Sequence, residues 1–363
     1  MSTLSNQTSQ DSHRRQSRSR LSRLAPRIHP RPRVVVAIIV AALVLLAASL
    51  VALSLGDRAT PLTQLFPALV GRGEENVVYA VREVRLPRLV LGIVVGFAFG
   101  VAGGLSQGVL RNPLASPDVL GVTSGASVGA VAVIALGATG GPVGILPLPV
   151  AALIGGFGAA ALIALLAIDG ALRGRRILLV GIAISTALTG VTQYLLTRMD
   201  VSDAQRAAAW LTGSLNARGW DEVIPLAIGI AVLLPIVLAL GHDGRALLFD
   251  SELSTAWGVH VGRVTVILLA CSVSLTALAT AAAGPVTFVA LVAGQLARRT
   301  ARVPDIPPLL SGLTGALIVV VADTIARTAL PVQLPVGVLT AVVGAPYLLY
   351  LLQQKRTTVG TPA

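Results

Sequence analysis

An all-α protein that crosses a membrane about ten times is the fold class that this sequence predicts. Of its 363 residues, 54% are hydrophobic and only 12% are charged, about half the charged share of a soluble domain. Apolar runs of about 20 residues, the length at which a helix crosses a bilayer, recur along the chain. The composition excludes a disordered chain and a soluble protein of two domains.

The first membrane span is expected at 34–55, where 22 consecutive residues carry no charge. This run starts too late and is too long to be the apolar part of a signal peptide. Residues 1–33 are rich in Ser and Arg and lack apolar periodicity, so we expect a disordered Arg-rich cytoplasmic arm.

Nine further apolar runs give the remaining spans. They are expected at 89–110, 118–137, 147–168, 177–198, 223–241, 263–283, 286–300, 308–328 and 335–353. The run at 286–300 is short and follows Gly284-Pro285. Residues 34–353 thus form one ten-helix membrane domain, and 354–363 a cytoplasmic tail.

Charge on the connecting segments orients these spans. The net charge is +12, from 28 Lys and Arg and 16 Asp and Glu. With the N-terminus in the cytoplasm, the cytoplasmic segments hold 19 basic and 7 acidic residues, and the outer segments hold 9 of each. Because cytoplasmic loops of membrane proteins are enriched in Lys and Arg, we expect both termini to be cytoplasmic.

Several kinds of chemistry are excluded by residues that the sequence lacks. Lys355 is the only lysine, so there is no Gly-x-x-x-x-Gly-Lys-Ser/Thr loop to bind nucleotide phosphates. Cys271 is the only cysteine, which leaves neither a disulfide framework nor a thiolate metal site. The four scattered histidines are His13, His29, His242 and His260. We expect no enzyme activity, no metal site and no cofactor in this chain.

Glycine recurs at every fourth position of the second expected span, at Gly92, Gly96, Gly100, Gly104 and Gly108. Residues four apart share one face of a helix, so this row forms a ridge without side chains. Such a ridge lets a neighbouring backbone approach closely. It could also form the smooth wall of a passage for a bulky solute, and the two interpretations are compatible.

Polar side chains are few inside the expected spans. The candidates to line a translocation path, or alternatively to join helices by hydrogen bonds, include Gln107, Ser185, Thr189 and Gln295. Asp323 is the only ionisable candidate; it either pairs with Arg327, four residues on, or takes part in ion coupling. Since ion-coupled transporters usually bury such groups at mid-membrane, their scarcity argues against an ion-coupled secondary transporter.

Five stretches together resemble the FecCD-type permeases of ABC importers for iron–siderophores, haem and cobalamin. They are Arg-Leu-Pro-Arg at 85–88, Gln-Gly-Val-Leu-Arg-Asn-Pro-Leu-Ala-Ser-Pro at 107–117, Trp-Leu-Thr-Gly-Ser-Leu at 210–215, Gly-Pro-Val-Thr-Phe-Val-Ala-Leu-Val at 284–292, and Ala-Asp-Thr-Ile-Ala-Arg at 322–327 followed by Leu-Pro-Val-Gly at 334–337. They occur in the family's order and cover roughly 34–353. Five motifs in order make the resemblance specific.

The resemblance implies a type II ABC importer permease in the plasma membrane. Its partners would be a second permease subunit, two cytoplasmic ATP-binding subunits that hold ATP and Mg, and an extracytoplasmic solute-binding protein. The missing phosphate loop agrees with ATP hydrolysis by another chain. The implied cargo is a ferric siderophore, since Gln295 before Arg298 and Arg299 is similar to the siderophore branch; haem or cobalamin is the alternative.

The resemblance also implies roles for residues at both membrane faces. Arg85, Arg88 and Arg327 match arginines that dock the solute-binding protein, through bidentate pairs with its carboxylates; the alternative is that they only reach the membrane interface. A cytoplasmic gate is implied at Asn112-Pro113-Leu114, where proline in any case prevents a continuous helix.

The cytoplasmic segment at 247–259 is implied to be the loop that couples the permease to its ATPase. Glu252 and Gly258 match the family pattern, whereas Trp257 departs from it. A short helix ending at Gly258 is expected, because glycine often terminates helices. The alternative is an ordinary cytoplasmic loop.

Overall fold

The computed structural model describes residues 32–56, 60–118, 120–137, 146–167, 174–249, 251–329 and 332–357. Nearly all of the arm expected at 1–33 lies outside these residues, as do the last six residues of the expected tail. The secondary-structure elements of the described part are all helical, which confirms the all-α prediction.

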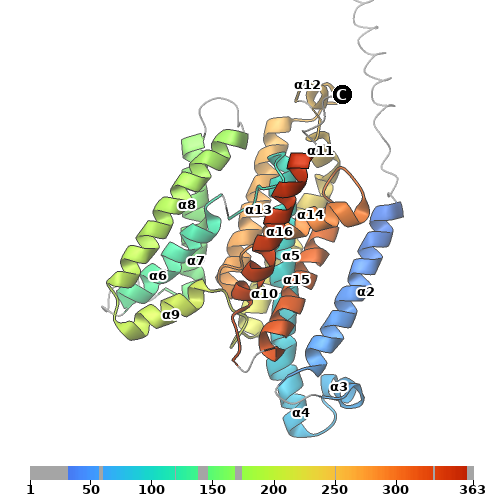
Figure 1. Ribbon diagram of the computed structural model, residues 1–363, viewed down its shortest axis with the longest axis vertical. Coiled ribbons are helices and arrows are strands. Elements are labelled where there is room, and N and C mark those ends of the chain that lie inside the picture. Colours follow the sequence, from blue (N-terminus) through green and yellow to red (C-terminus); the bar gives the residue numbers. More distant parts are fainter. Residues whose placement is uncertain are drawn as a thin grey trace, which may run out of the picture.

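Sixteen helical segments follow one another along the described chain, and Figure 1 shows most of them. They are α2 (Pro32–Ser54), α3 (Leu62–Leu69), α4 (Glu75–Tyr79), η1 (Ala80–Arg85), α5 (Leu86–Val109), α6 (Val122–Gly137), α7 (Leu148–Ala167), α8 (Gly174–Thr197), α9 (Val201–Leu211), α10 (Trp220–Ala239), α11 (Gly241–Ala246), α12 (Ser251–Ala256), α13 (Val261–Ala283), α14 (Val289–Ala301), α15 (Pro308–Thr328) and α16 (Val336–Thr357).

Each of the ten expected spans corresponds to a helix, and two of them need correction: α6 starts at Val122 rather than at the expected 118, and the eighth span is also shorter than expected. Seven helical runs are long and apolar enough to cross a membrane, and α6 and the apolar part of α16 are shorter. The eighth expected span, 286–300, is wrong in length. Its helix α14 starts only at Val289 and has 13 residues, about 20 Å at 1.5 Å per residue. Pro285 and the left-handed backbone of Phe288 (φ 66°) keep the preceding residues out of the helix.

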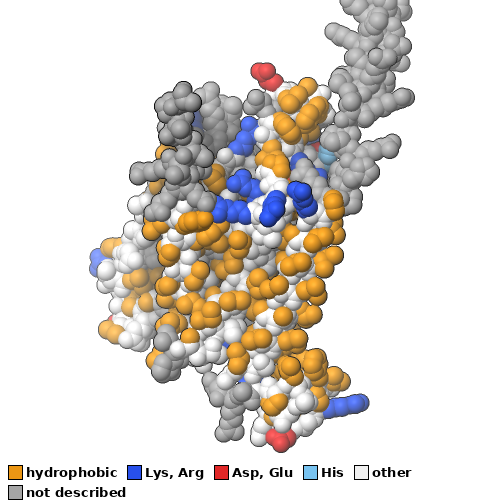
Figure 2. Space-filling model, turned by 45° about the vertical axis from the view of Figure 1, so that its right-hand side comes forward, with side chains coloured by type: hydrophobic (Ala, Val, Ile, Leu, Met, Phe, Trp, Pro, Cys, Tyr) orange, Lys and Arg blue, Asp and Glu red, His pale blue; other side chains and the backbone are white. Residues whose placement is uncertain are grey.

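Helix α5 is the centre of the bundle (Figure 1). It packs on α10, α13, α14 and α15, whereas α6, α7, α8 and α9 form a second group beside it. The α5 run is 72% buried in its most apolar part, whereas α2 and α8 are each 17% buried. Apolar helices with such exposed sides suit a lipid surrounding, and Figure 2 shows hydrophobic side chains over the middle of the protein.

The glycine row of α5 serves close packing against α15. A Cβ on Gly96 would lie 2.5 Å from the carbonyl oxygen of Gly315, and one on Gly100 would collide with the backbone of Ser311. At Gly108, the last of the row, a Cβ would meet nothing within 4 Å. The close-packing interpretation is therefore confirmed for the middle of the row, and open space begins at its end.

Helices α4, η1 and α5 form one continuous run from Glu75 to Val109. Its first part widens into a π-helical turn at Ala80–Arg85. Pro87 follows directly, and proline has no N–H to bond back to the preceding turn. A wider turn before a proline relieves this mismatch, so the run continues without a break.

Candidate functional site

The arginine–aspartate cluster lies where α5 begins and α15 ends, and comprises Arg85, Arg88, Asp323 and Arg327. The Arg88 guanidinium donates to both Asp323 carboxylate oxygens, with nitrogen–oxygen distances of 2.8–3.2 Å. Arg327 lies 3.2 Å from the same carboxylate. The pair four residues apart that the sequence allowed is thus confirmed, and Asp323 lies between two guanidinium groups.

The remaining bonds of the cluster hold the end of α2. Arg85 donates to the carbonyl of Leu53 at 2.8 Å and to the hydroxyl of Thr60 at 3.0 Å. Arg327 donates to the carbonyl of Ala52 at 3.1 Å. The structure therefore brings together the three arginines that the resemblance marked for docking. These three arginines also have a structural role, because their hydrogen bonds and ion pairs join α2, α5 and α15.

A hollow of about 360 Å³ lies beside Arg88, between the end of α9 and the chain before α16. Among the described residues that line it, Arg88 is the only charged one, and the polar ones are Thr212, Ser214, Asn216 and Gln333. Arg88 also donates to the side-chain oxygen of Asn216 at 3.1 Å. The cluster as a whole contains three guanidinium groups and one carboxylate, so positive charge is in excess next to the hollow.

The predicted gate is a tight turn at the opposite end of α5. The side-chain oxygen of Asn112 accepts the backbone N–H of Leu114 at 3.0 Å, and its carbonyl accepts that of Ala115 at 3.0 Å. Helix α5 ends at Val109 and α6 starts only at Val122. The non-helical turn predicted at Asn112-Pro113-Leu114 is therefore present, and the gating role remains a prediction.

Arg111 joins this turn to the segment that contains α11 and α12. Its guanidinium donates to the carbonyls of Leu247, at 2.5 Å, and Phe249. The backbone of Arg111 is left-handed, with φ of 49°. Sequence reasoning missed this contact, because its acceptors are backbone carbonyls about 136 residues away and no residue type marks them.

The segment implied to couple to an ATPase forms a compact hairpin of short helices. The hydroxyl of Ser254 in α12 donates to the carbonyl of Ala246 in α11 at 2.7 Å. Helix α12 ends at Ala256, and the chain turns through Gly258, whose φ of +84° favours glycine. The expected short helix with a glycine stop is thus confirmed.

Hydrophobic side chains are exposed around α12. The α12 apolar patch comprises Leu248, Phe249, Leu253 and Trp257, each 39–48% exposed. The rings of Phe249 and Trp257 meet edge to face at 5.1 Å, and Glu252 is exposed beside them. Figure 2 shows hydrophobic side chains at this end of the protein, above a group of Lys and Arg. Exposed patches of this kind often mark sites of protein contact.

The four candidates for the translocation path fall into two pairs. Gln107 is 3% exposed and donates to the carbonyl of Leu291 at 2.8 Å, while Gln295 donates to the Gln107 side chain at 2.8 Å. These two therefore join α5 to α14. On α8, Ser185 is half-buried and Thr189 is exposed, and the Thr189 hydroxyl bonds to the carbonyl of Ser185. Only the α8 pair faces the outside of this subunit.

Asp118 is a buried carboxyl group that the sequence analysis overlooked when it named Asp323 as the only ionisable candidate. The residue lies in the loop before α6, which starts at Val122 rather than at the expected 118. One of its carboxylate oxygens is enclosed without a hydrogen-bond partner. Desolvation by burial raises the pKa of Asp118 to about 6, against a smaller lowering by a hydrogen bond with Thr123.

Within the described residues, no three His, Cys, Asp or Glu side chains gather as metal ligands. The described helices instead form a bundle, several of them long enough to cross a bilayer, with a charged cluster at one end and an exposed apolar patch at the other. These features define a multi-pass membrane protein.

Comparison with known proteins gives the family. The chain belongs to the FecCD transport family, whose model matches residues 32–354. It is 35% identical to the Fe(3+)-citrate import system permease protein YfmE of Bacillus subtilis (strain 168), over 88% of this chain and 96% of the relative. Identity is also 35% to the ferric enterobactin transport system permease protein FepG of Escherichia coli (strain K12), over 88% of this chain and 97% of the relative.

A solved structure shares the fold. It shows a metal-chelate type ABC transporter in an inward-facing conformation, with a TM-score of 0.75 and 25% sequence identity, and the match covers 88% of this chain and 99% of the other. The protein is thus a multi-pass permease of the plasma membrane.

Proposed function

We propose that this protein is the membrane permease of an ATP-driven importer that carries a ferric chelate into the cell. The observation that carries this proposal is the match of the whole membrane domain to import permeases named for ferric citrate and ferric enterobactin. The chain supplies the passage and no chemistry of its own. A second permease subunit would complete the passage, with the α8 residues Ser185 and Thr189 on its wall.

The arginine–aspartate cluster is the proposed docking site for an extracytoplasmic solute-binding protein. Its excess positive charge would attract carboxylates, and the polar hollow beside Arg88 offers space for an acidic side chain. Arg88 and Arg327 are each 12% exposed, so the partner would meet the edges of guanidinium groups that Asp323 already holds in place. Such preorganisation reduces the entropy lost on docking.

The α12 apolar patch is the proposed docking site for an ATP-binding subunit, which would hold the ATP and Mg. Both termini are proposed to be cytoplasmic, on the same side as this patch, because the basic residues gather there. Exposed aromatic residues are frequent anchors of protein interfaces. A movement of this segment would reach the gate turn through Arg111, which bonds to Leu247 and Phe249.

The test is uptake in cells that lack the chromosomal permease. Restoring the gene should restore growth under iron limitation with ferric citrate or a ferric catecholate, whereas cobalamin and haem serve as the alternative cargoes. If the gene restores growth only with cobalamin or only with haem, that compound replaces the ferric chelate as the proposed cargo. Uptake that persists after the ATP-binding subunit is inactivated would contradict an ATP-driven importer.

A further inference from the structure

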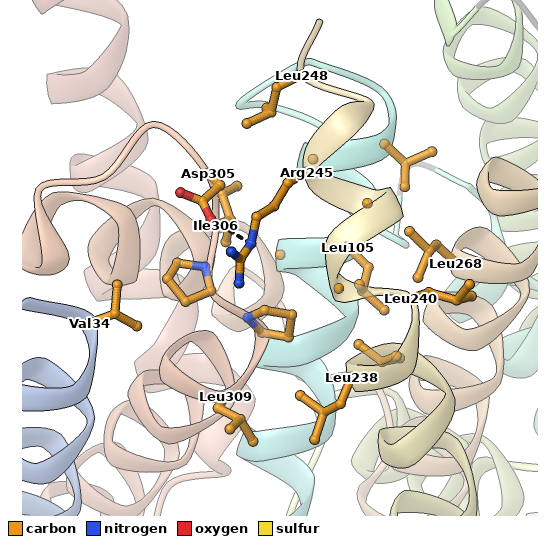
Figure 3. A pocket seen from close by; sticks show the side chains of 18 of the residues that line it. Val34, Leu105, Leu238, Leu240, Arg245, Leu248, Leu268, Asp305, Ile306 and Leu309 are labelled. Carbon is orange, nitrogen blue, oxygen red and sulfur yellow. Dashed lines mark ion pairs between the residues drawn. The ribbon is translucent and has the colours of Figure 1, made fainter. Parts of the chain in front are cut away.

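A cavity of about 320 Å³ lies between α2 on one side and α5, α10 and α11 on the other (Figure 3). This lies within the size range of small-molecule sites. The chain that leads into α15, Asp305–Leu309, closes one wall. No role described above uses this cavity.

The described residues that line the cavity are apolar with one exception. Branched aliphatic side chains cover most of it, among them Val34, Leu105, Leu238, Leu268 and Leu309. The exception is an ion pair in which Arg245 lies 3.4 Å from Asp305. Figure 3 shows Arg245 directed from α11 toward Asp305 and into the cavity. The Arg245 side chain remains 43% exposed, whereas Asp305 is 14% exposed.

The rim of the cavity belongs to the outer surface of the bundle. Val35, Leu238 and Leu248 line it and are 42%, 46% and 39% exposed. Val35 lies on α2 and Leu238 on α10, and these two helices are only 17% and 22% buried, so this side of the cavity opens on the apolar outer surface. Leu248 lies beyond α11, at the end of the cavity next to the α12 apolar patch. An apolar cavity with this rim opens toward acyl chains. It does not suit a ferric chelate, whose polar groups would find few partners on these walls.

The charged end of the cavity lies just beyond the end of the apolar helix α10, which is expected to be the membrane interface. Helix α10 stops at Ala239, and Arg245 follows on the short helix α11. A guanidinium at this level is in reach of lipid phosphates, with which arginine forms charge-assisted bonds. The site therefore has the polarity of a phospholipid: one charged end at the interface and an apolar interior.

We propose that this cavity binds one glycerophospholipid of the bilayer, with an acyl chain against the glycine end of α5 and the phosphate on Arg245. The site is independent of the transported cargo. The lipid would fill the space between α2 and the α10–α11 corner. It would thereby support the segment that leads to the α12 apolar patch.

Two glycines of the lining allow the cavity to be filled without a clash. A Cβ on Gly108 or on Gly241 would meet no protein atom within 4 Å, so leucine at either position extends into space assigned to the acyl chain. Gly158 in α7 is a matched control, because it is exposed and equally free of neighbours but lies away from the cavity.

The experiment uses the full-length permease with its partner subunits in nanodiscs of phosphatidylethanolamine and phosphatidylglycerol. A photoreactive diazirine amino acid replaces Leu238, and the products of irradiation are identified by mass spectrometry. The expected product is an adduct of a phospholipid. An adduct of a ferric chelate, or a cross-link to residues 1–31 of the chain itself, would overturn the proposal.

Variants then test the two ends of the site. Gly108→Leu and Gly241→Leu, singly or together, should lower the phospholipid adduct at least about fivefold, while Gly158→Leu leaves it unchanged. Arg245→Gln should lower capture of phosphatidylglycerol but not that of added diacylglycerol, which has no phosphate. Equal capture in the wild type and the filled variants would refute the site, and equal capture in Arg245→Gln would refute the phosphate contact.

Discussion

The two ends of helix α5 are built in opposite ways. At its start, Arg88 and Arg327, both almost enclosed, share the Asp323 carboxylate, while Arg85 and Arg327 donate to carbonyls of α2. At its end, one arginine, Arg111, holds a turn against two carbonyls of a hairpin whose apolar side chains are exposed. Charge is buried at one end and apolar surface is exposed at the other.

This difference separates a fixed end from a movable one. A network in which each guanidinium has several partners resists displacement, because every bond must break together. The hydrogen bonds that Arg111 donates to Leu247 and Phe249 both come from one side chain, so this turn can separate from the α11–α12 segment when a single side chain moves. The proposed docking at the fixed end and the proposed movement at the other end would therefore be carried out by separate parts of the subunit.

The largest effect is expected from Asp323→Ala, which would break the fixed end. Two guanidinium groups would lose the carboxylate between them, and removing one partner of a buried ion pair costs about 3–5 kcal/mol. We expect the amount of folded permease in the membrane, and its melting temperature in detergent, to fall sharply. Glu75→Ala, an exposed acid at the same end, should change neither, and an equal loss in both variants would remove the special role of the cluster.

Arg111→Ala tests the movable end. It removes two charge-assisted hydrogen bonds, each worth about 1.5–3 kcal/mol, without touching the membrane core. We expect the number of chelates imported per ATP hydrolysed to fall about tenfold or more in proteoliposomes with the assembled importer. Arg111→Lys, which keeps the charge, should restore part of the coupling. A normal transport ratio in the alanine variant would show that the turn moves independently of α12.

Trp257→Ala tests the α12 apolar patch at the same end, with a smaller expected effect than Arg111→Ala. Trp257 is 48% exposed and touches Phe249, so its loss should cost the folded subunit only about 0.5–1.5 kcal/mol. Capture of the ATP-binding subunit by the permease should weaken severalfold. Trp220→Ala is the control, because Trp220 is 38% exposed at the start of α10. Equal weakening by both would mean that the patch makes no specific contact.

An effect confined to one pH range is expected from Asp118→Asn, in the loop between the movable turn and α6. Because burial raises the pKa of Asp118 to about 6, its folded form favours the protonated carboxyl. The stability that it contributes is therefore present below about pH 4 and is lost as the pH rises through 6. The melting temperature of the wild type should fall relative to the asparagine variant between pH 4 and 7; parallel curves would contradict this.

The membrane helices were predictable because each corresponds to an apolar run of roughly the same length in the sequence. The glycine row of α5 likewise predicted the close approach to α15. The α14 boundary was not predictable, since the left-handed Phe288 depends on packing rather than on residue type. Arg111, Asp118 and the cavity beside Arg245 were also missed, because each depends on the distance between segments that are far apart in the chain.

The continuous run from Glu75 to Val109 has 35 residues and is about 52 Å long. A hydrocarbon core of about 30 Å cannot cover this length, so about 20 Å of the helical run extends beyond the hydrocarbon core of the bilayer. A rod of this kind acts as a lever arm. A tilt of about 10° over the roughly 35 Å between Arg88 and Arg111 displaces one end by about 6 Å relative to the other. A docked partner that tilts this rod would thus shift the turn on the far side, and because Arg88 is bonded to Asp323, α15 would move with α5.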